Sequence, residues 1–203
     1  MTRARWIVFD LNGTLLDPRQ IGPDVLDEAI LAGMTLNQVG EYRPFSDLLR
    51  AALARRRPAE EVDALMQAAA RMPPFPEAAE ALDVLAAAGL QLAVLTNSPT
   101  ATAESGLRAA GLRDHFAHVI GTDQVETFKP DARVYRHALS VFGAEPQEAT
   151  MVAAHWWDLR GARAEGMRVA WVARREGRLS ALLPEPDAEG ADLLAVAAVL
   201  TAR

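Results

Sequence analysis

Several features that would point to a particular compartment or partner are missing from this sequence. The 203 residues contain no cysteine, so the sequence predicts neither a disulfide framework nor thiol chemistry. No apolar run approaches the length of a membrane span, and residues 1–5 lead straight into the first predicted strand without room for a signal sequence. We therefore expect a cytoplasmic protein with no membrane partner.

The chain also lacks an excess of positive charge, with 21 basic against 27 acidic residues. The formal net charge of −6 argues against a nucleic-acid partner, because binding to phosphates needs clustered positive charge. Of the 21 basic residues, only Lys129 is a lysine. A compact ammonium and a planar guanidinium are not interchangeable, so a single lysine in an arginine-using chain indicates a site where arginine would not serve.

What the sequence does contain is an apolar stretch near its start that ends in polar residues. Residues 6–9 are all apolar, and Asp10, Asn12 and Thr14 follow them. Such a run is typical of a strand that is buried on both faces of a parallel sheet. Ligands bind at the carboxyl ends of strands in open α/β sheets, so the sequence predicts a site at Asp10.

The rest of the chain predicts an α/β fold with a helical insertion. Residues 17–76 lack strand-like runs and carry apolar residues at three-to-four spacing, which indicates three or four short helices. The strands predicted after this insertion are 91–95, 118–120, 149–153 and 168–172, and the helices are 77–88, 101–110, 132–142, 159–165 and 192–200. This alternation predicts a doubly wound parallel sheet with helices on both faces, and residues 184–190 are expected to be a polar connection only.

Three further polar stretches follow in the chain. Thr96 and Asn97 come directly after a predicted strand, where a hydroxyl and an amide can hold an anionic group, although a simple helix cap explains them equally well. The second stretch is 128–131, FKPD, and contains the single lysine. The third is 151–158, MVAAHWWD, and ends in Asp158.

Together with the stretch around Asp10, these segments resemble, in their order, the four motifs of the haloacid dehalogenase superfamily. The resemblance implies a nucleophilic Asp10, a Rossmann-like core domain over residues 1–16 and 77–203, and a small all-helical cap domain over residues 17–76. The stretch 129–135, KPDARVY, is similar to the form found in the L-2-haloacid dehalogenase (type II) branch. The resemblance also implies a homodimer.

Two positions separate the branches of this superfamily. Asn12 stands where its phosphatases usually carry a second Asp, and Ala154 stands where many of them carry a magnesium ligand. Asp10 and Asp158 alone make a poor magnesium site. Asn12 has no proton to give to a leaving alkoxide, whereas a leaving halide needs none. We therefore expect a hydrolase without metal or cofactor; a magnesium-dependent phosphatase and a catalytically inactive binding protein are the alternatives.

For the dehalogenase branch, the resemblance implies covalent catalysis in two steps. Asp10 attacks the carbon that bears the halogen in a short 2-haloalkanoic acid, and water then hydrolyses the ester to a 2-hydroxy acid. Lys129 keeps Asp10 ionised by lowering its pKa and stabilises the oxyanion. Asp158 is the best candidate to activate the water, and His155 is expected to help orient it. Thr14 and Tyr135 are expected to hold Asp10 and Lys129 in place.

The remaining assignments concern contacts with the halogenated substrate. The residues expected to hold its carboxylate are Leu11, Asn12, Thr96 and Asn97. Arg43 of the cap is the candidate for binding the halide, and His155 and Trp156 are expected beside it; packing of Trp156 against the cap is the alternative. Two large rings would shrink the halide pocket, and a ring N–H would donate to departing fluoride, which extends the expected substrates to fluoroacetate.

Overall fold

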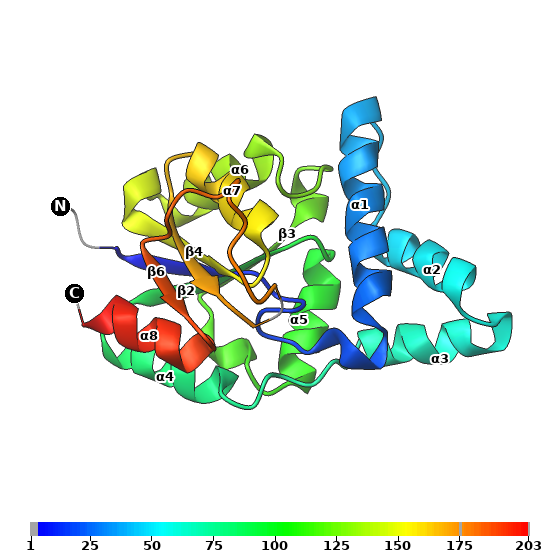
Figure 1. The fold of residues 1–203 in the computed structure, drawn as a ribbon, viewed down its shortest axis with the longest axis horizontal. Coiled ribbons are helices and arrows are strands. Elements are labelled where there is room, and N and C mark those ends of the chain that lie inside the picture. Colours follow the sequence, from blue (N-terminus) through cyan, green and yellow to red (C-terminus); the bar gives the residue numbers. More distant parts are fainter. Residues whose placement is uncertain (1–3, 175, 203) are drawn as a thin grey trace.

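The fold is built on a six-stranded parallel sheet with strand order β3-β2-β1-β4-β5-β6 (Figure 1). The computed structural model describes residues 4–174 and 176–202. The strands are β1 (Trp6–Phe9), β2 (Gln91–Thr96), β3 (His118–Gly121), β4 (Ala149–Ala153), β5 (Arg168–Val172) and β6 (Ala188–Gly190). The predicted α/β fold class, with a helical segment after the first strand, is confirmed.

Strand β1 lies in the middle of the sheet, between β2 and β4. All four of its residues are buried, as its unbroken apolar composition predicts. Phe9 is in register with Val94 of β2 and with Val152 of β4. The three strands therefore end side by side, and the segments that follow them, including Asp10, meet at one edge of the sheet.

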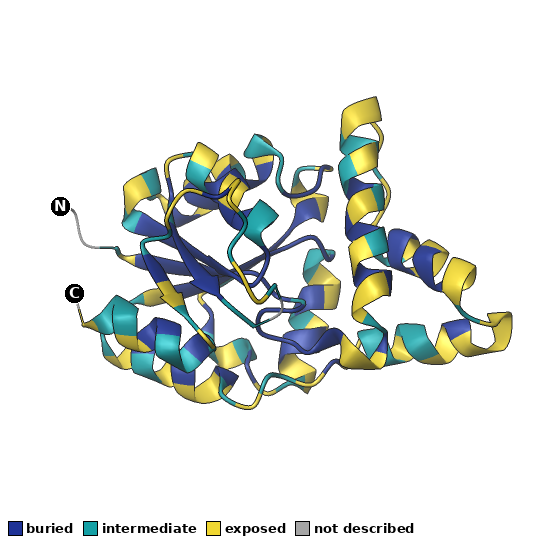
Figure 2. Cartoon of the chain, in the orientation of Figure 1, coloured by how far each residue is buried: buried dark blue, intermediate teal, exposed yellow. Residues whose placement is uncertain are grey.

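Helices cover both faces of the sheet. The core helices are α4 (Ala78–Ala87), α5 (Thr100–Ala109), α6 (Ala132–Phe142), α7 (Trp156–Ala164) and α8 (Leu193–Thr201). Alternate residues of β1 pack on opposite sides: Ile7 belongs to the apolar cluster with α4, α5 and α8, whereas Val8 belongs to the cluster with α6 and α7. Figure 2 shows the resulting dark blue sheet between helices that are exposed on their outer sides.

Residues 17–76, which we call the cap, contain α1 (Pro23–Val39), α2 (Phe45–Arg56) and α3 (Ala59–Ala69). Helix α1 ends where Gly40 adopts a left-handed conformation with φ of 72°. The chain leaves and re-enters the core along paired segments, since the N–H of Asp17 donates to the carbonyl of Pro73 at 2.8 Å. Figure 1 shows the cap helices grouped at one side of the core. The domain boundaries at residues 16 and 77 stay a prediction.

Short 3₁₀ turns connect several elements, at Pro18–Gln20 (η1), Arg113–His115 (η2), Thr122–Gln124 (η3) and Pro146–Glu148 (η4). No helix in residues 4–174 and 176–202 combines the length and the apolar composition that crossing a membrane requires.

Two predicted elements differ from the structure. Residues 188–190 form strand β6 on the edge of the sheet, with Ala188 in register with Ala170, although the sequence predicted only a polar connection over 184–190. This strand has three residues with a polar residue in the middle, so it gives no apolar run to detect. Helix α7 begins at Trp156 and not at Leu159, because His155 already has the extended backbone of an N-cap residue.

Candidate active site

The centre of the site is a buried cluster of two carboxylates and one ammonium. Lys129 Nζ donates to Asp10 Oδ1 at 2.8 Å, to Asp158 Oδ2 at 2.6 Å and to the carbonyl of Leu95 at 2.9 Å. Lys129 and Asp158 are 0 % exposed and Asp10 is 5 % exposed. An ammonium has three hydrogens to donate, so Lys129 uses its full donor capacity inside the protein.

The three residues come from three different parts of the core. Asp10 follows β1, Asp158 lies in the first turn of α7 after β4, and Lys129 lies in the loop before α6. The loop is anchored where the backbone N–H of Lys129 donates to Asn97 Oδ1 at 2.9 Å. Because Asn97 directly follows β2, this bond ties the lysine to the sheet edge that carries Asp10.

The opposite charges of Asp10 and Lys129 stabilise each other's ionised form. Burial alone would raise the pKa of Asp10, but the charge of Lys129 and the hydrogen bonds from His155 and Lys129 outweigh it and hold this pKa well below 3.8. Burial would lower the pKa of Lys129, but attraction to Asp10 and Asp158 raises it above 10.5. Asp10 is therefore an ionised carboxylate at neutral pH, as a nucleophile requires.

Asp158 is held from two sides. Besides the bond from Lys129 to Oδ2, the Tyr135 hydroxyl donates to Asp158 Oδ1 at 2.7 Å. Burial, helped by repulsion from Asp10, raises the pKa of Asp158 although Lys129 opposes this. Burial also raises the pKa of Tyr135 well above 10, so its hydroxyl stays a proton donor to Asp158. The structure thus brings Tyr135 to Asp158, and through Asp158 to Lys129.

The second oxygen of Asp10 is held by Thr14 and His155. Thr14 Oγ1 donates to Asp10 Oδ2 at 2.9 Å and accepts from the backbone N–H of Ala154 at 3.0 Å. His155 Nδ1 lies 3.2 Å from the same Oδ2. An ionised carboxylate only accepts hydrogen bonds, so Nδ1 carries the proton. A neutral His155 then has its lone pair on Nε2, which is buried without a hydrogen-bond partner among the described residues.

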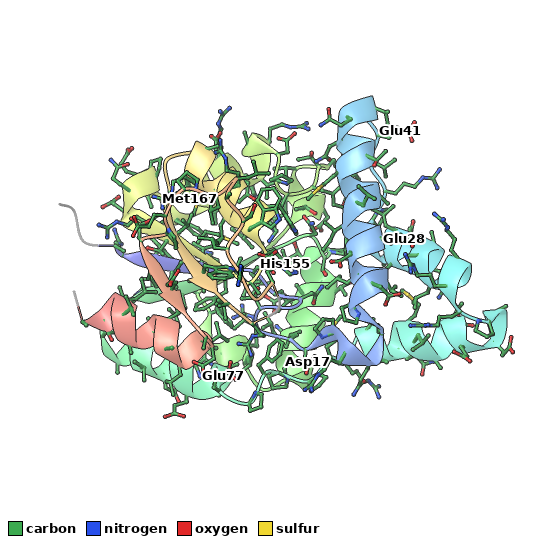
Figure 3. All side chains as sticks on the ribbon, viewed as in Figure 1. Asp17, Glu28, Glu41, Glu77, His155 and Met167 are labelled. Atoms are coloured by element: carbon green, nitrogen blue, oxygen red, sulfur yellow. The ribbon has the colours of Figure 1, made fainter. Side chains whose placement is uncertain are left out.

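The position of His155 depends on a glycine beneath it. Gly13 has φ of 85°, and a Cβ at this position would lie 2.8 Å from His155 Cε1. Both the left-handed backbone and the close approach exclude a side chain here. Figure 3 labels His155 on the side of the sheet that faces α1.

A small cavity lies over Asp10. Its lining residues are Asp10, Asn12, Leu26, Ile30, Phe45, Thr96, Asn97, His155 and Trp157. The polar lining residues come from the core, and the cap contributes only apolar ones. The volume is about 10 Å³, which is close to the minimum that holds one water molecule. In this conformation the cavity therefore has room for about one water molecule.

The residues predicted to hold the substrate carboxylate do lie together. Thr96 and Asn97 line the cavity, and Thr96 Oγ1 accepts the backbone N–H of Ser98 at 3.2 Å. Asn97 Oδ1 accepts the backbone N–H of Lys129, so the side-chain NH₂ of Asn97 keeps its donors for a ligand. Asn12 also lines the cavity and donates to Ser98 Oγ at 3.2 Å. Leu11 is 2 % exposed and lines a second space, next to this cavity, between the cap and the core.

Arg43 is not brought to this cavity. It is exposed and lines a separate groove on the outside of α1 and α2. The inward positions around it are taken by Tyr42 and Phe45, whose rings lie 5.2 Å and 6.2 Å from the ring of Phe128. The assignment of Arg43 to the halide is therefore corrected, and no arginine is among the described residues that line the cavity.

The tryptophan beside Asp10 is Trp157 and not Trp156. Trp157 lines the cavity, with its ring centroid 5.4 Å from the ring of His155 and 6.0 Å from Lys129 Nζ. Trp156 does not line it; its backbone N–H donates to the carboxylate of Glu176. Both residues lie in the first turn of α7, where neighbouring side chains point about 100° apart. The sequence did not lead us to predict Trp157 as a site residue, although it stands directly before the predicted site residue Asp158.

The donor set does not fit magnesium. Asp10 Oδ1 and Asp158 Oδ2 both accept from Lys129 Nζ, and Ala154 adds no side-chain oxygen. Across the described parts of the chain, no three His, Asp or Glu side chains gather as a potential metal site. Mg²⁺ needs near-ideal octahedral coordination by oxygen, which this arrangement does not offer.

Comparisons with known proteins agree with this geometry. The profile of the haloacid dehalogenase-like hydrolase family matches residues 4–166. The (S)-2-haloacid dehalogenase of Pseudomonas sp. (strain YL) is 30% identical over 97% of this chain and 94% of its own length. The solved structure of the L-2-haloacid dehalogenase RSc1362 has a TM-score of 0.89 at 28% identity, covering 98% of this chain and 99% of that one.

A phosphatase also matches, but over a shorter stretch. The phosphoserine phosphatase of Thermus thermophilus is 40% identical over 122 residues, which are 60% of this chain and 49% of that relative. The two dehalogenases named above match along nearly the whole chain, cap included. This chain belongs to the haloacid dehalogenase superfamily, in its L-2-haloacid dehalogenase branch, and is an (S)-2-haloacid dehalogenase-like hydrolase.

Proposed function

We propose that this protein hydrolyses short 2-haloalkanoic acids to 2-hydroxy acids through an ester on Asp10. The observation that carries the proposal is the ionised Asp10, held by Lys129 at 2.8 Å at the floor of a cavity where Asn12 replaces a proton-donating acid. A carboxylate nucleophile without a partner acid suits the departure of halide, which needs no proton.

In the first step, an Asp10 oxygen attacks the carbon that bears the halogen. The new C–O bond forms as the carbon–halogen bond breaks, and the bonding electron pair leaves with the halide. The substrate carboxylate lies on Thr96, Asn97 and the backbone amides of Leu11 and Asn12, which aim the carbon at Asp10. Thr14 holds the nucleophile in place.

In the second step, water attacks the carboxyl carbon of the Asp10 ester. Lys129 stabilises the oxyanion, and collapse of the tetrahedral intermediate frees Asp10 and the 2-hydroxy acid. His155 Nε2 is a better acceptor for the water proton than Asp158. His155 lines the cavity, and its Nε2 has no hydrogen-bond partner among the described residues. Both oxygens of Asp158 already accept hydrogen bonds, from Lys129 and Tyr135. His155 then returns that proton to the departing alkoxide, and the net products are the alcohol, halide and one proton.

Fluoroacetate is included in the proposed substrates. The support is the pair of rings in the wall of the cavity, those of His155 and Trp157, whose centroids lie 5.4 Å apart. A narrow pocket favours the smallest halide over the larger ones. We also propose that the protein acts as a homodimer, which the family resemblance implies, and in the cytoplasm, since its sequence has no apolar run as long as a membrane span.

The experiment that tests the reaction is halide release from L- and D-2-chloropropionate, and from fluoroacetate, with and without EDTA. We expect release from the L-isomer that EDTA does not reduce, and no release by Asp10→Asn. Loss of activity in EDTA that magnesium restores would overturn metal independence. If fluoride release is no higher than with the Asp10→Asn protein while chloroacetate is turned over well, fluoroacetate is not a substrate.

A magnesium-dependent phosphatase is the second candidate on the 122-residue match to a phosphoserine phosphatase alone, since the donor set around Asp10 does not fit magnesium. Its test is phosphate release from phosphoserine and p-nitrophenyl phosphate with added magnesium. Phosphate release without halide release would replace the proposed reaction with this one. Activity in neither assay would favour an inactive binding protein.

A further inference from the structure

A second chamber lies beside the cavity over Asp10, between the cap and the core. Its volume is about 230 Å³. The cap wall includes Phe45 and Leu49 of α2 and Met66 and Ala69 of α3, and the core wall includes Ala103 and Gly106 of α5. Helix α5 is the core helix drawn beside the cap in Figure 1.

The chamber and the cavity share part of their walls. Leu11 and Asn12 after β1 line the chamber, and Asn12 and Phe45 line both spaces. Asn12 Nδ2 donates to Ser98 Oγ at 3.2 Å, and Ser98 lines the chamber but is not among the described residues that line the cavity. A molecule whose carboxylate contacts Asn12 therefore has the chamber directly next to it.

The chemistry of the chamber is apolar. None of its lining residues in the described chain carries a charge, and its polar side chains are limited to Asn12, Ser46, Ser98 and Thr102. Apolar side chains and small residues fill the rest of the wall. Such a space favours hydrocarbon, because polar groups that enter it would lose water without gaining partners.

We propose that this chamber binds the hydrocarbon chain of the substrate, so that linear 2-haloalkanoic acids of about six carbons are preferred over 2-chloropropionate. The proposal rests on the proposed function and names its substrate class. The volume of the chamber, about 230 Å³, is many times the roughly 10–15 Å³ that one water molecule needs. An unbranched chain of several methylenes fits a space of that size.

The size of the preference follows from the burial of methylenes. Each buried CH₂ favours binding by a factor of about four. Moving from 2-chloropropionate to 2-chlorohexanoate adds three methylenes, so kcat/KM rises by up to about 60-fold if all three are buried. The measured quantity is the ratio of kcat/KM for 2-chlorohexanoate over kcat/KM for 2-chloropropionate. A general loss of activity lowers both values and leaves this ratio unchanged.

Gly106 provides the substitution that fills the chamber. A Cβ at Gly106 would meet only the Leu16 side chain, at 3.8 Å, which is ordinary van der Waals contact. Gly106→Leu therefore places a bulky group in the chamber without a backbone clash, and we expect the ratio to fall to near one. Ala109→Leu adds the same side chain at an exposed position of α5, and we expect it to keep the wild-type ratio.

A second variant enters from the opposite wall. Ala69→Leu, at a half-buried position of α3, fills the chamber from the cap side. It keeps the test decisive if Gly106→Leu does not fold. A ratio near one in the wild-type protein, or a wild-type ratio in the folded chamber variants, would overturn the proposal.

Binding measurements separate this proposal from the reaction itself. We expect calorimetry to show that hexanoate binds the wild-type protein more tightly than acetate does, and that the chamber variants abolish the difference. If no haloacid is dehalogenated but hexanoate shows this pattern, the proposed reaction fails and the chamber stands. If 2-chloropropionate is turned over but hexanoate binds no better than acetate, the chamber assignment fails and the reaction stands.

Discussion

At the scale of single residues, we expect the contact between Asp10 and Lys129 to be decisive for catalysis. Asp10→Asn removes the nucleophile, and we expect turnover to fall by at least about 10⁴-fold. A single turnover of the wild-type enzyme in H₂¹⁸O should place the label in the carboxylate of Asp10, detected by mass spectrometry of its peptide. Label found in the 2-hydroxy acid on the first turnover would instead mean direct attack by water.

Lys129 cannot be replaced by the other common cation. Its compact ammonium reaches three acceptors in a fully buried space, and a planar guanidinium does not fit that geometry. We expect Lys129→Arg to lose at least about 10²-fold in halide release. Lys129→Met should also lower the free energy of unfolding in urea by about 3–5 kcal/mol, because it leaves buried carboxylates unpaired.

The control for these lysine variants is Arg108→Lys, an exposed exchange of cations on α5. It should change neither halide release nor urea unfolding. Wild-type activity in Lys129→Arg would show that any positive charge suffices and would contradict the argument from shape.

The proton transfer by His155 is expected to be needed in the second step. In His155→Leu, Asp10 still attacks the substrate, but the ester is hydrolysed slowly because no group takes the water proton. Rapid mixing should show a burst of about one halide per active site, followed by steady release that is slower by about 10²- to 10⁴-fold. His137→Leu, at a partly exposed histidine on α6 that contacts Gln124, is the control. Steady release at the wild-type rate without a burst would rule out this role.

At the scale of elements, the start of α7 determines which tryptophan lines the cavity over Asp10. Trp157 lines the cavity and Trp156 does not. Trp157→Ala should widen the halide pocket and raise the ratio of kcat/KM for bromoacetate over chloroacetate by about 10-fold. Trp156→Ala is the matched control and should leave this ratio unchanged. The reverse outcome would mean that α7 starts at a different residue in solution.

At the scale of the whole molecule, stability should depend on the charges of the buried cluster. The pKa of Asp10 is held below 3.8, so its ionised form contributes stability at pH values above 3.8 that is lost as the pH falls through its folded-state value. The pKa of Lys129 is raised above 10.5, so its contribution is complete below 10.5 and is lost as the pH rises further. Both contributions are complete only between these limits.

Urea unfolding over a range of pH tests this dependence. The difference in unfolding free energy between the wild-type protein and Asp10→Asn should be constant at neutral pH and shrink as the pH falls below 3.8. A difference that grows in acid would mean that burial of Asp10 outweighs the attraction of Lys129.

Much of the fold and of the site follows from local sequence. The apolar run at residues 6–9 determines a buried central strand, and the polar residues after it determine where the site lies. The single lysine and Asp158 are likewise predicted as site residues from the sequence. The structure places Lys129 within hydrogen-bonding distance of both Asp10 and Asp158. These features depend on composition and on position along the chain, which the sequence states directly.

Other features were decided only by the tertiary structure. Arg43 points away from the cavity because Tyr42 and Phe45 pack on Phe128, a residue more than 80 positions further along the chain. Trp157 replaces Trp156 in the cavity wall because α7 starts directly after His155. The chamber exists because helices of the cap close over α5. Each depends on how distant segments pack, and side-chain direction in a loop or first helical turn leaves no periodic signal in the sequence.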